Sequence, residues 1–140
     1  MHRPWLTLRR AALAFAFGAS LAGGFVSAAT AQSAFPFGRE FMLDTEPMKG
    51  SKRIPSMDID DKGVADITLW CSSVKSQLVV AGDTVTIITG PKTEGSCPSE
   101  RMQADDDLLA ALTGVTNWKL EGDTLVLTGV RTMRFRPESN

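Results

Sequence analysis

The sequence has very little of the chemistry that most enzymes use for proton transfer. It contains no tyrosine and a single histidine, His2, which lies in a segment that we expect to be removed. A mature chain without histidine excludes Ser/His/Asp and Cys/His catalysis within the chain, histidine-ligated zinc and a histidine pH switch. The sequence therefore points away from the commonest hydrolases and zinc enzymes.

Residues 1–31 have the three-part pattern of a secretory signal peptide. A basic start holds three arginines, an uncharged apolar stretch follows from Ala11 to about Val26, and small residues precede Gln32. No cysteine follows the expected cleavage point, so we do not expect a lipid anchor there. We predict cleavage between Ala31 and Gln32, and therefore a periplasmic or secreted protein.

Two alternatives remain open for this N-terminal segment. The stretch from Ala11 to Ala31 is almost long enough to span a bilayer and could be retained as an anchor, although no cluster of Lys and Arg follows it. The adjacent Arg9 and Arg10 are compatible with either Sec or twin-arginine export. We favour cleavage, which would leave a protein without stable membrane insertion.

Cleavage would also change the charge of the chain. Of its 140 residues, 109 would remain, enough for one domain, with 12 Lys and Arg against 16 Asp and Glu. A nucleic-acid binder needs a basic patch to offset phosphate charge, and this surface is mildly acidic. We therefore expect a single domain without a nucleic-acid partner.

The chain has two cysteines, Cys71 and Cys97. In an oxidising compartment, an even pair in a small domain is most simply a structural disulfide. Two thiols alone make a poor metal site, and a redox-active pair would more often have the Cys-x-x-Cys spacing. We therefore favour a disulfide that closes a loop of about 26 residues.

The pattern after an apolar lead-in, residues 32–38, which we expect to be flexible, is mostly that of β-strands. Gly82-Asp83 and Gly122-Asp123 each separate two strand-like runs and predict tight hairpin turns. We place the β-rich domain at residues 39–137. Strands are predicted over residues 40–44, 56–60, 64–71, 77–81, 84–89, 118–121, 124–128 and 131–136, with a loop over residues 46–55.

One helix is predicted between the two Gly-Asp hairpins. Its core is residues 105–112, its start lies as early as residues 98–100, and Gly114 ends it. The three aspartates at 105–107 would occupy the helix start, where carboxylates meet free amides and the positive end of the dipole. The fold class is mainly β (α+β): a small antiparallel β-barrel or curled sheet of seven to eight strands, with the helix over an opening or edge.

Acidic clusters do not predict a metal site here. The segment 58–63 looks like the start of a calcium loop, but the twelfth position from Asp58 is Leu69, where such a loop needs a glutamate. We interpret this segment as a hairpin turn. A cation could bind the aspartates at 105–107, but a place at the helix start explains them without one. We assign no catalytic, cofactor-binding or metal-binding residue, and expect no cofactor.

Three basic and two aromatic side chains allow two interpretations each. Arg134 and Arg136, with Lys119, could bind an anionic partner, but such charges more often protect a strand edge from aggregation. Trp70 and Trp118 are interpreted as core or barrel-mouth residues rather than as ligand-stacking residues.

Several motifs also follow one another in a recognisable order. They are Trp70-Cys71-Ser72, residues 93–98 (Thr-Glu-Gly-Ser-Cys-Pro), residues 107–112 (Asp-Leu-Leu-Ala-Ala-Leu), residues 118–127 and Met133-Arg134-Phe135. This order resembles the META domain, the family of the heat-shock protein HslJ, over about residues 41–136. The family pattern has Asn after the first cysteine and Met-Ala before the second, whereas this chain has Ser72 and Gly95-Ser96, as in a divergent member.

The resemblance implies a small β-rich envelope protein with no established catalytic site, linked to stress or antibiotic tolerance, motility or secretion. It also implies that Cys71 and Cys97 are a structural pair. We therefore expect a non-enzymatic protein that aids stress tolerance by binding or stabilising an envelope protein or a small ligand. An alternative is a secreted or periplasmic inhibitor of a lysozyme or protease that presents the loop from Gly90 to Ser99. A carboxylate-based hydrolase is a third.

Overall fold

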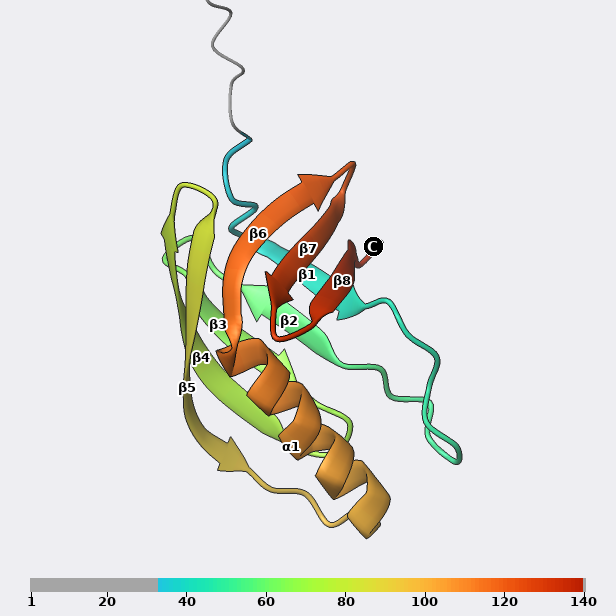
Figure 1. Ribbon diagram of the computed structural model, residues 1–140. Helices are drawn as coiled ribbons and strands as arrows, with labels where there is room; N and C mark the ends of the chain where they lie inside the picture. The colour runs from blue at the N-terminus through green and yellow to red at the C-terminus, as the bar shows by residue number, and fades with distance from the viewer. Residues whose placement is uncertain (1–32, 140) are drawn as a thin grey trace, which may run out of the picture. The chain divides into compact units, whose positions relative to one another are not determined.

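Eight strands within residues 33–139 close into an antiparallel barrel in which every strand pairs with its neighbours in sequence and β8 returns to β1 (Figure 1). A computed structural model describes residues 33–139, so the expected signal peptide and Gln32 lie outside the described residues. The elements are β1 (Arg39–Leu43), β2 (Ser56–Ile59), β3 (Val64–Thr68), β4 (Ser73–Ala81), β5 (Thr84–Thr93), α1 (Ser99–Thr113), β6 (Val115–Glu121), β7 (Thr124–Gly129) and β8 (Thr132–Pro137). The predicted mainly β fold with one helix is confirmed.

Three turns have the chemistry that the sequence indicates. Gly82 and Gly122 have φ angles of 60° and 62°, a conformation that glycine adopts without steric cost. In the turn between β2 and β3, the Asp60 carboxylate accepts hydrogen bonds from the backbone N–H groups of Lys62 and Val64, each at 2.8 Å. Because its oxygen is used within the turn, Asp60 acts as a turn residue, as predicted for the segment that resembles a calcium loop.

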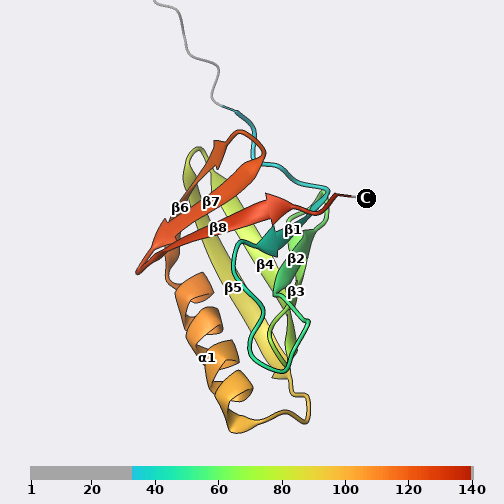
Figure 2. The same ribbon diagram turned by 90° about the vertical axis from the view of Figure 1, so that its right-hand side faces the viewer.

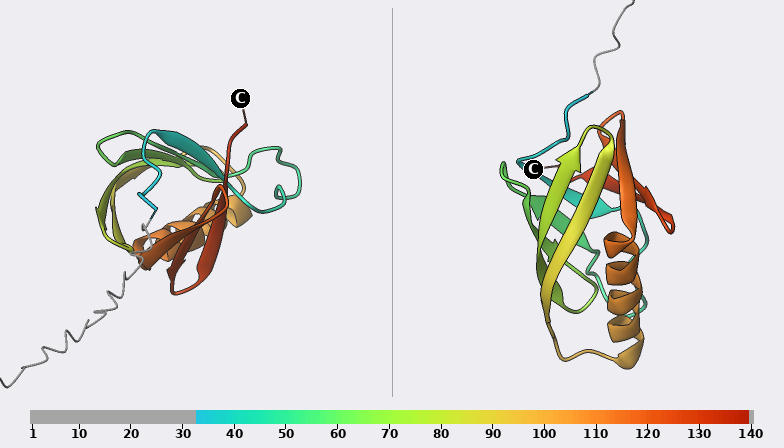
Figure 3. Two further views of the ribbon diagram at one scale, coloured as in Figure 1. Left: turned by 90° about the horizontal axis from the view of Figure 1, so that it is seen from above. Right: turned by 60° about the vertical axis from the view of Figure 1, so that its left-hand side comes forward.

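Helix α1 covers the gap between β5 and β6. These two strands share one register pair, Thr84 with Asn117, and the Trp118 backbone N–H donates to Asp83 O, in the turn before β5, at 2.9 Å. The helix lies alongside β5 and leads directly into β6 (Figures 2 and 3). Its residues Leu108 and Leu112, 2 % and 1 % exposed, join the barrel core. The expected packing of the helix over an opening is therefore confirmed.

Several element boundaries differ from the prediction. β5 ends later than predicted, at Thr93, and β6 begins earlier, at Val115. The helix begins at Ser99, the early start that the sequence allows, so Asp105 lies in its second turn and the predicted role of residues 105–107 at the helix start is wrong. β3 ends at Thr68 rather than at Cys71, because a tight connection follows in which the Leu69 N–H donates to Ser72 O at 2.9 Å. β4 consequently begins at Ser73, four residues before the predicted start.

Among residues 33–139, no helix is long and apolar enough to cross a membrane.

One aromatic side chain of the lead-in, Phe35, packs against the barrel. Phe35 is 7 % exposed and belongs to the core, with its ring centroid 4.9 Å from that of Trp118 in an edge-on arrangement. Trp118 is itself buried, and its indole N–H donates to Gly82 O at 2.8 Å. The lead-in lies at the end of the barrel away from α1 (Figure 1). An aromatic pair thus anchors this segment, and Trp118 is a barrel-mouth residue, as predicted.

The basic residues of β8 do not protect a strand edge. β8 pairs with β7 on one side and β1 on the other, so it has no free edge, and that interpretation is wrong. Arg134 instead pairs with Glu121 at 2.5 Å, and Arg136 pairs with Asp44 at 3.0 Å. Lys119 also pairs with Glu121, at 2.6 Å. All three ion pairs are exposed: Arg134–Glu121 links β8 to β6 across β7, Arg136–Asp44 links β8 to the residue after β1, and Lys119–Glu121 lies within β6.

The cluster around Glu121 predicts a dependence of stability on acid pH. Hydrogen bonds from Lys119 and from Arg134 lower the pKa of Glu121 from an ordinary 4.5 to about 2. A carboxyl with a depressed pKa stabilises the fold fully above its unfolded pKa and loses this contribution as pH falls through the folded value. Urea unfolding should therefore show the wild type more stable than Glu121→Gln at pH 7, and the difference should shrink between pH 4.5 and 2. A difference that does not change with pH would contradict this assignment.

Candidate functional site

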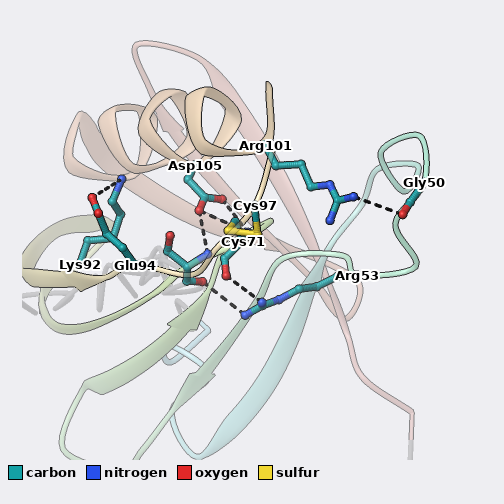
Figure 4. The surroundings of a disulfide bond; sticks show 9 residues. Gly50, Arg53, Cys71, Lys92, Glu94, Cys97, Arg101 and Asp105 are labelled. Atoms are coloured by element: carbon teal, nitrogen blue, oxygen red, sulfur yellow. Dashed lines mark hydrogen bonds and ion pairs between the residues drawn. A yellow bond between two sulfur atoms is a disulfide. The ribbon is translucent and has the colours of Figure 1, made fainter. Parts of the chain in front are cut away.

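The candidate site begins at the disulfide that joins Cys71 to Cys97, with an S–S distance of 2.03 Å (Figure 4). The bond ties the connection between β3 and β4 to the segment that precedes α1. A Cβ atom on Gly95 would lie 2.8 Å from the carbonyl oxygen of Cys71, so a residue without a side chain is needed beside the bond. The disulfide and its neighbours are therefore closely packed.

A buried carboxylate holds the helix to the same connection. Asp105 is fully buried, and its carboxylate accepts hydrogen bonds from the backbone N–H of Cys71 at 3.0 Å and of Ser72 at 2.8 Å (Figure 4). A buried carboxylate is costly unless its oxygens are hydrogen-bonded, and these two donors meet that need. Asp105 thus fixes α1 to the backbone beside the disulfide.

A guanidinium binds the opposite side of these peptide groups. Arg53 donates from Nη1 to the carbonyl oxygen of Cys71 at 3.0 Å and from Nη2 to that of Ser72 at 3.3 Å. The backbone at 71–72 therefore lies between a carboxylate and a guanidinium, as Figure 4 shows. We call this unit the clamp: the Cys71–Cys97 disulfide with Asp105 and Arg53. It joins the loop after β1, the β3–β4 connection and α1.

The predicted loop from Gly90 to Ser99 is shorter in the structure, because β5 runs to Thr93 and α1 begins at Ser99. This connection is held at a second point as well. Lys92 Nζ lies 2.5 Å from the Asp106 carboxylate and 3.9 Å from that of Glu94. The hydrogen bond with Asp106 raises the pKa of the Lys92 ammonium above its ordinary value. The loop is thus fixed by this ion pair and by the disulfide, while residues 93–96 between the two points are exposed.

Beside the clamp lies a cavity of about 440 Å³. It opens between α1, the end of β1 and the start of β8, and Trp70 and Ala104 border it, each one residue before a member of the clamp. The clamp therefore sets the positions of two walls of this cavity. It is lined by Leu43, Asp44, Thr45, Trp70, Ala104, Asp107, Leu108, Arg131, Thr132, Met133 and Arg134.

The cavity combines an apolar floor with a charged rim. Trp70, Leu108 and Met133 are 9 %, 2 % and 5 % exposed, so their accessible surface is small and the floor is fixed by the core. On the rim, Asp44 and Arg134 are already paired, with Arg136 and Glu121 respectively. Such a mixture of apolar surface and a few polar groups is typical of small-molecule pockets.

Two charged groups on the rim, Arg131 and Asp107, have no partner of opposite charge within residues 33–139. Asp107 accepts a hydrogen bond on Oδ1 from the Gln103 amide at 3.0 Å. Both side chains are exposed, and they come from different elements, α1 and the β7–β8 connection. They are the groups through which the rim could bind a charged ligand.

Sequence reasoning identified some of these residues and missed others. Trp70 and Arg134 line the cavity, whereas Lys119 and Arg136 do not. The buried role of Asp105 was missed, although a signal was present: it lies three residues before Leu108 and seven before Leu112, on the apolar face of the helix. Arg53 and Arg131 gave no local signal, because their partners or neighbours in space are distant in sequence.

The described part of the chain contains no group of three or more His, Cys, Asp or Glu side chains that could hold a metal ion.

Comparison with known proteins gives one finding, a family model described as META domain that matches residues 39–140. No curated protein and no solved structure gives a significant match. The family match covers the whole barrel, the clamp and the cavity.

Proposed function

Because the chain belongs to the META domain family, we propose that it is an exported, non-enzymatic binding protein that contributes to tolerance of envelope stress or antibiotics. The observation that carries this proposal is the cavity of about 440 Å³ beside the clamp. Its size falls within the range of about 300–1,000 Å³ found for small-molecule sites. We infer that its ligand, or a side chain of a partner protein, enters between α1 and the β7–β8 connection.

The chemistry of the lining favours binding over catalysis. The hydroxyl groups at the cavity belong to Thr45 and Thr132, and a threonine nucleophile needs an adjacent base. The sequence has one histidine, at position 2, so no imidazole of residues 33–139 can serve as that base. In the clamp, the charged groups of Asp105 and Arg53 are bound to the backbone at 71–72 and do not face a ligand. The pocket beside them is rigid and has an apolar floor.

Export is part of the proposal. A disulfide persists in oxidising compartments such as the periplasm or the extracellular space and is rare in the cytosol. The bond between Cys71 and Cys97, together with the signal-like pattern of residues 1–31, supports a periplasmic or secreted location. N-terminal sequencing of the exported protein should give a chain that begins at Gln32; a chain that begins at Met1 would overturn this part of the proposal.

The function can be tested by filling the cavity. Ala104 lines it and Ala110 is exposed on the same helix away from it, so Ala104→Trp and Ala110→Trp are matched substitutions. In a deletion strain challenged with heat, envelope stress or antibiotics, we expect wild type and Ala110→Trp to restore tolerance. We expect Ala104→Trp to fail at the same protein level in the envelope, because its indole occupies the ligand's space.

Two outcomes would overturn the proposed function. One is a deletion strain whose tolerance equals that of its parent under all three challenges. The other is full restoration by Ala104→Trp, which would show that the cavity is not the site that matters. Circular dichroism of both variants should match the wild type, so that a failure of Ala104→Trp reports on the cavity and not on folding.

A second candidate function, inhibition of a lysozyme or protease, has its own supporting observation. Residues 93–96 are exposed and are held at both ends, by the Lys92–Asp106 ion pair and by the disulfide at Cys97. A loop that is already ordered loses little entropy when it enters an active site. Assays against a panel of lysozymes and proteases test this candidate, and the absence of any inhibition would remove it.

A further inference from the structure

We propose that the cavity beside the clamp binds a zwitterion with an apolar side chain, either a free amino acid or a short peptide. This inference rests on the proposed function, because it names the ligand class of the same cavity. Three features of the lining carry it: the apolar floor, and the guanidinium of Arg131 and the carboxylate of Asp107, neither of which forms an ion pair among residues 33–139.

The floor selects an apolar side chain. Trp70, Leu108 and Met133 line the cavity and are almost completely buried, so they belong to the core and keep their positions when a ligand enters. Because these three side chains have little accessible surface, the apolar contact with a ligand comes mainly from Leu43 and Ala104, which line the same cavity and are only half-buried. Transfer of an apolar side chain from water onto this surface is favourable in proportion to the area covered. The clamp adds rigidity, because it fixes the backbone directly after Trp70 and the helix residue directly after Ala104.

The rim selects a ligand with one charge of each sign. Arg131 can hold a carboxylate with two parallel N–H···O bonds, and Asp107 can accept hydrogen bonds from an ammonium group. The other two charged residues of the lining, Asp44 and Arg134, are already neutralised by Arg136 and Glu121. A ligand with a single charge would cover the second rim group without pairing it, and desolvation of an unpaired charge opposes binding.

The binding test uses leucine and its blocked forms with the exported protein, its disulfide intact, measured by titration calorimetry. We expect leucine to bind, and leucinamide and N-acetylleucine each to bind about tenfold more weakly, because each lacks one charge-assisted hydrogen-bonded contact. N-acetylleucinamide, which lacks both charges, should bind more weakly still. Leucyl-leucine distinguishes the two ligand classes, a free amino acid and a short peptide. Tighter binding than leucine indicates a peptide ligand, and weaker binding indicates a free amino acid.

Variants assign each charge to its residue. Arg131→Gln should bind leucine and leucinamide equally, since the group that distinguishes them is gone. Asp107→Asn should likewise bind leucine and N-acetylleucine equally. Arg39→Gln and Asp123→Asn remove exposed charges outside the cavity lining and should keep the full preference of the wild type.

The outcomes separate this inference from the proposed function. If the wild type binds leucine and N-acetylleucinamide equally, the ligand is not recognised as a zwitterion and this inference is overturned. The cavity would still be a binding site. Absence of binding for every compound would also overturn the inference, while the complementation test with Ala104→Trp decides independently whether the cavity matters. An unchanged preference in Arg131→Gln or Asp107→Asn would show that the charge is bound elsewhere and would contradict the assignment.

Discussion

Asp105→Ala is expected to lower the free energy of unfolding by about 3 kcal/mol. The carboxylate is fully buried and accepts hydrogen bonds from the N–H groups of Cys71 and Ser72. Its removal leaves both donors buried without a partner and leaves Arg53 bound to peptide groups that have lost their negative partner. Urea unfolding followed by circular dichroism measures the loss, which corresponds to a fall in Tm of about 15 °C for a domain of this size.

A neighbouring aspartate provides the control. Asp106→Ala removes an exposed carboxylate from the same helix, together with its ion pair to Lys92, and should cost less than about 1 kcal/mol. Asp105→Asn should fall between the two, because its amide oxygen replaces only one of the two carboxylate oxygens, while the new amide N–H₂ faces a backbone N–H and lacks an acceptor. Equal stability of Asp105→Ala and Asp106→Ala would show that Asp105 does not hold the helix to the backbone at 71–72.

Removal of the disulfide is expected to have a similar effect. The bond closes a loop of 26 residues, and the chain-entropy model gives about 3.5 kcal/mol for a loop of that length. The double variant Cys71→Ala/Cys97→Ala should therefore unfold at a clearly lower urea concentration than the oxidised wild type. Its Cys71→Ala change also removes a buried sulfur, so the loss can exceed the entropic value.

The wild type treated with a dithiol reductant separates these two contributions. Reduction opens the loop but keeps both sulfur atoms, so its effect reports on loop closure alone. Electrospray mass spectrometry should show a gain of two hydrogens on reduction, as expected for one disulfide. If the reduced and oxidised proteins unfold at the same urea concentration, the disulfide does not stabilise this fold, and the clamp depends on Asp105 and Arg53 alone.

Local sequence patterns predict most of this fold. The two Gly-Asp turns need a positive φ and are each enclosed by alternating strands, so both hairpins follow from a few adjacent residues. The spacing of Leu108 and Leu112 predicts the apolar face of the helix. Closure of the barrel does not follow from such patterns, because it depends on the pairing of β1 with β8, whose partner residues lie more than ninety positions apart in the chain.

The parts that sequence reasoning missed depend on contacts distant in the chain. Phe35 reads as a residue of a flexible lead-in until its ring is placed against Trp118. Arg53 reads as one charge of a polar loop until the carbonyl groups of the β3–β4 connection are placed before it. Asp105 reads as a helix-start residue until its two backbone donors appear, thirty-three and thirty-four residues earlier. In each case the partner, not the residue itself, defines the role.

The central claim is that a ligand enters the cavity beside Trp70, and the two indole N–H groups of residues 33–139 test it most directly. Trp70 borders the cavity, whereas Trp118 is not in its lining and its indole N–H is hydrogen-bonded to Gly82, in the turn between β4 and β5. In a ¹⁵N-labelled sample titrated with leucine or leucyl-leucine, we predict that the Trp70 indole signal shifts saturably and the Trp118 signal stays in place. An unmoved Trp70 signal, or a shift confined to Trp118, would contradict the claim.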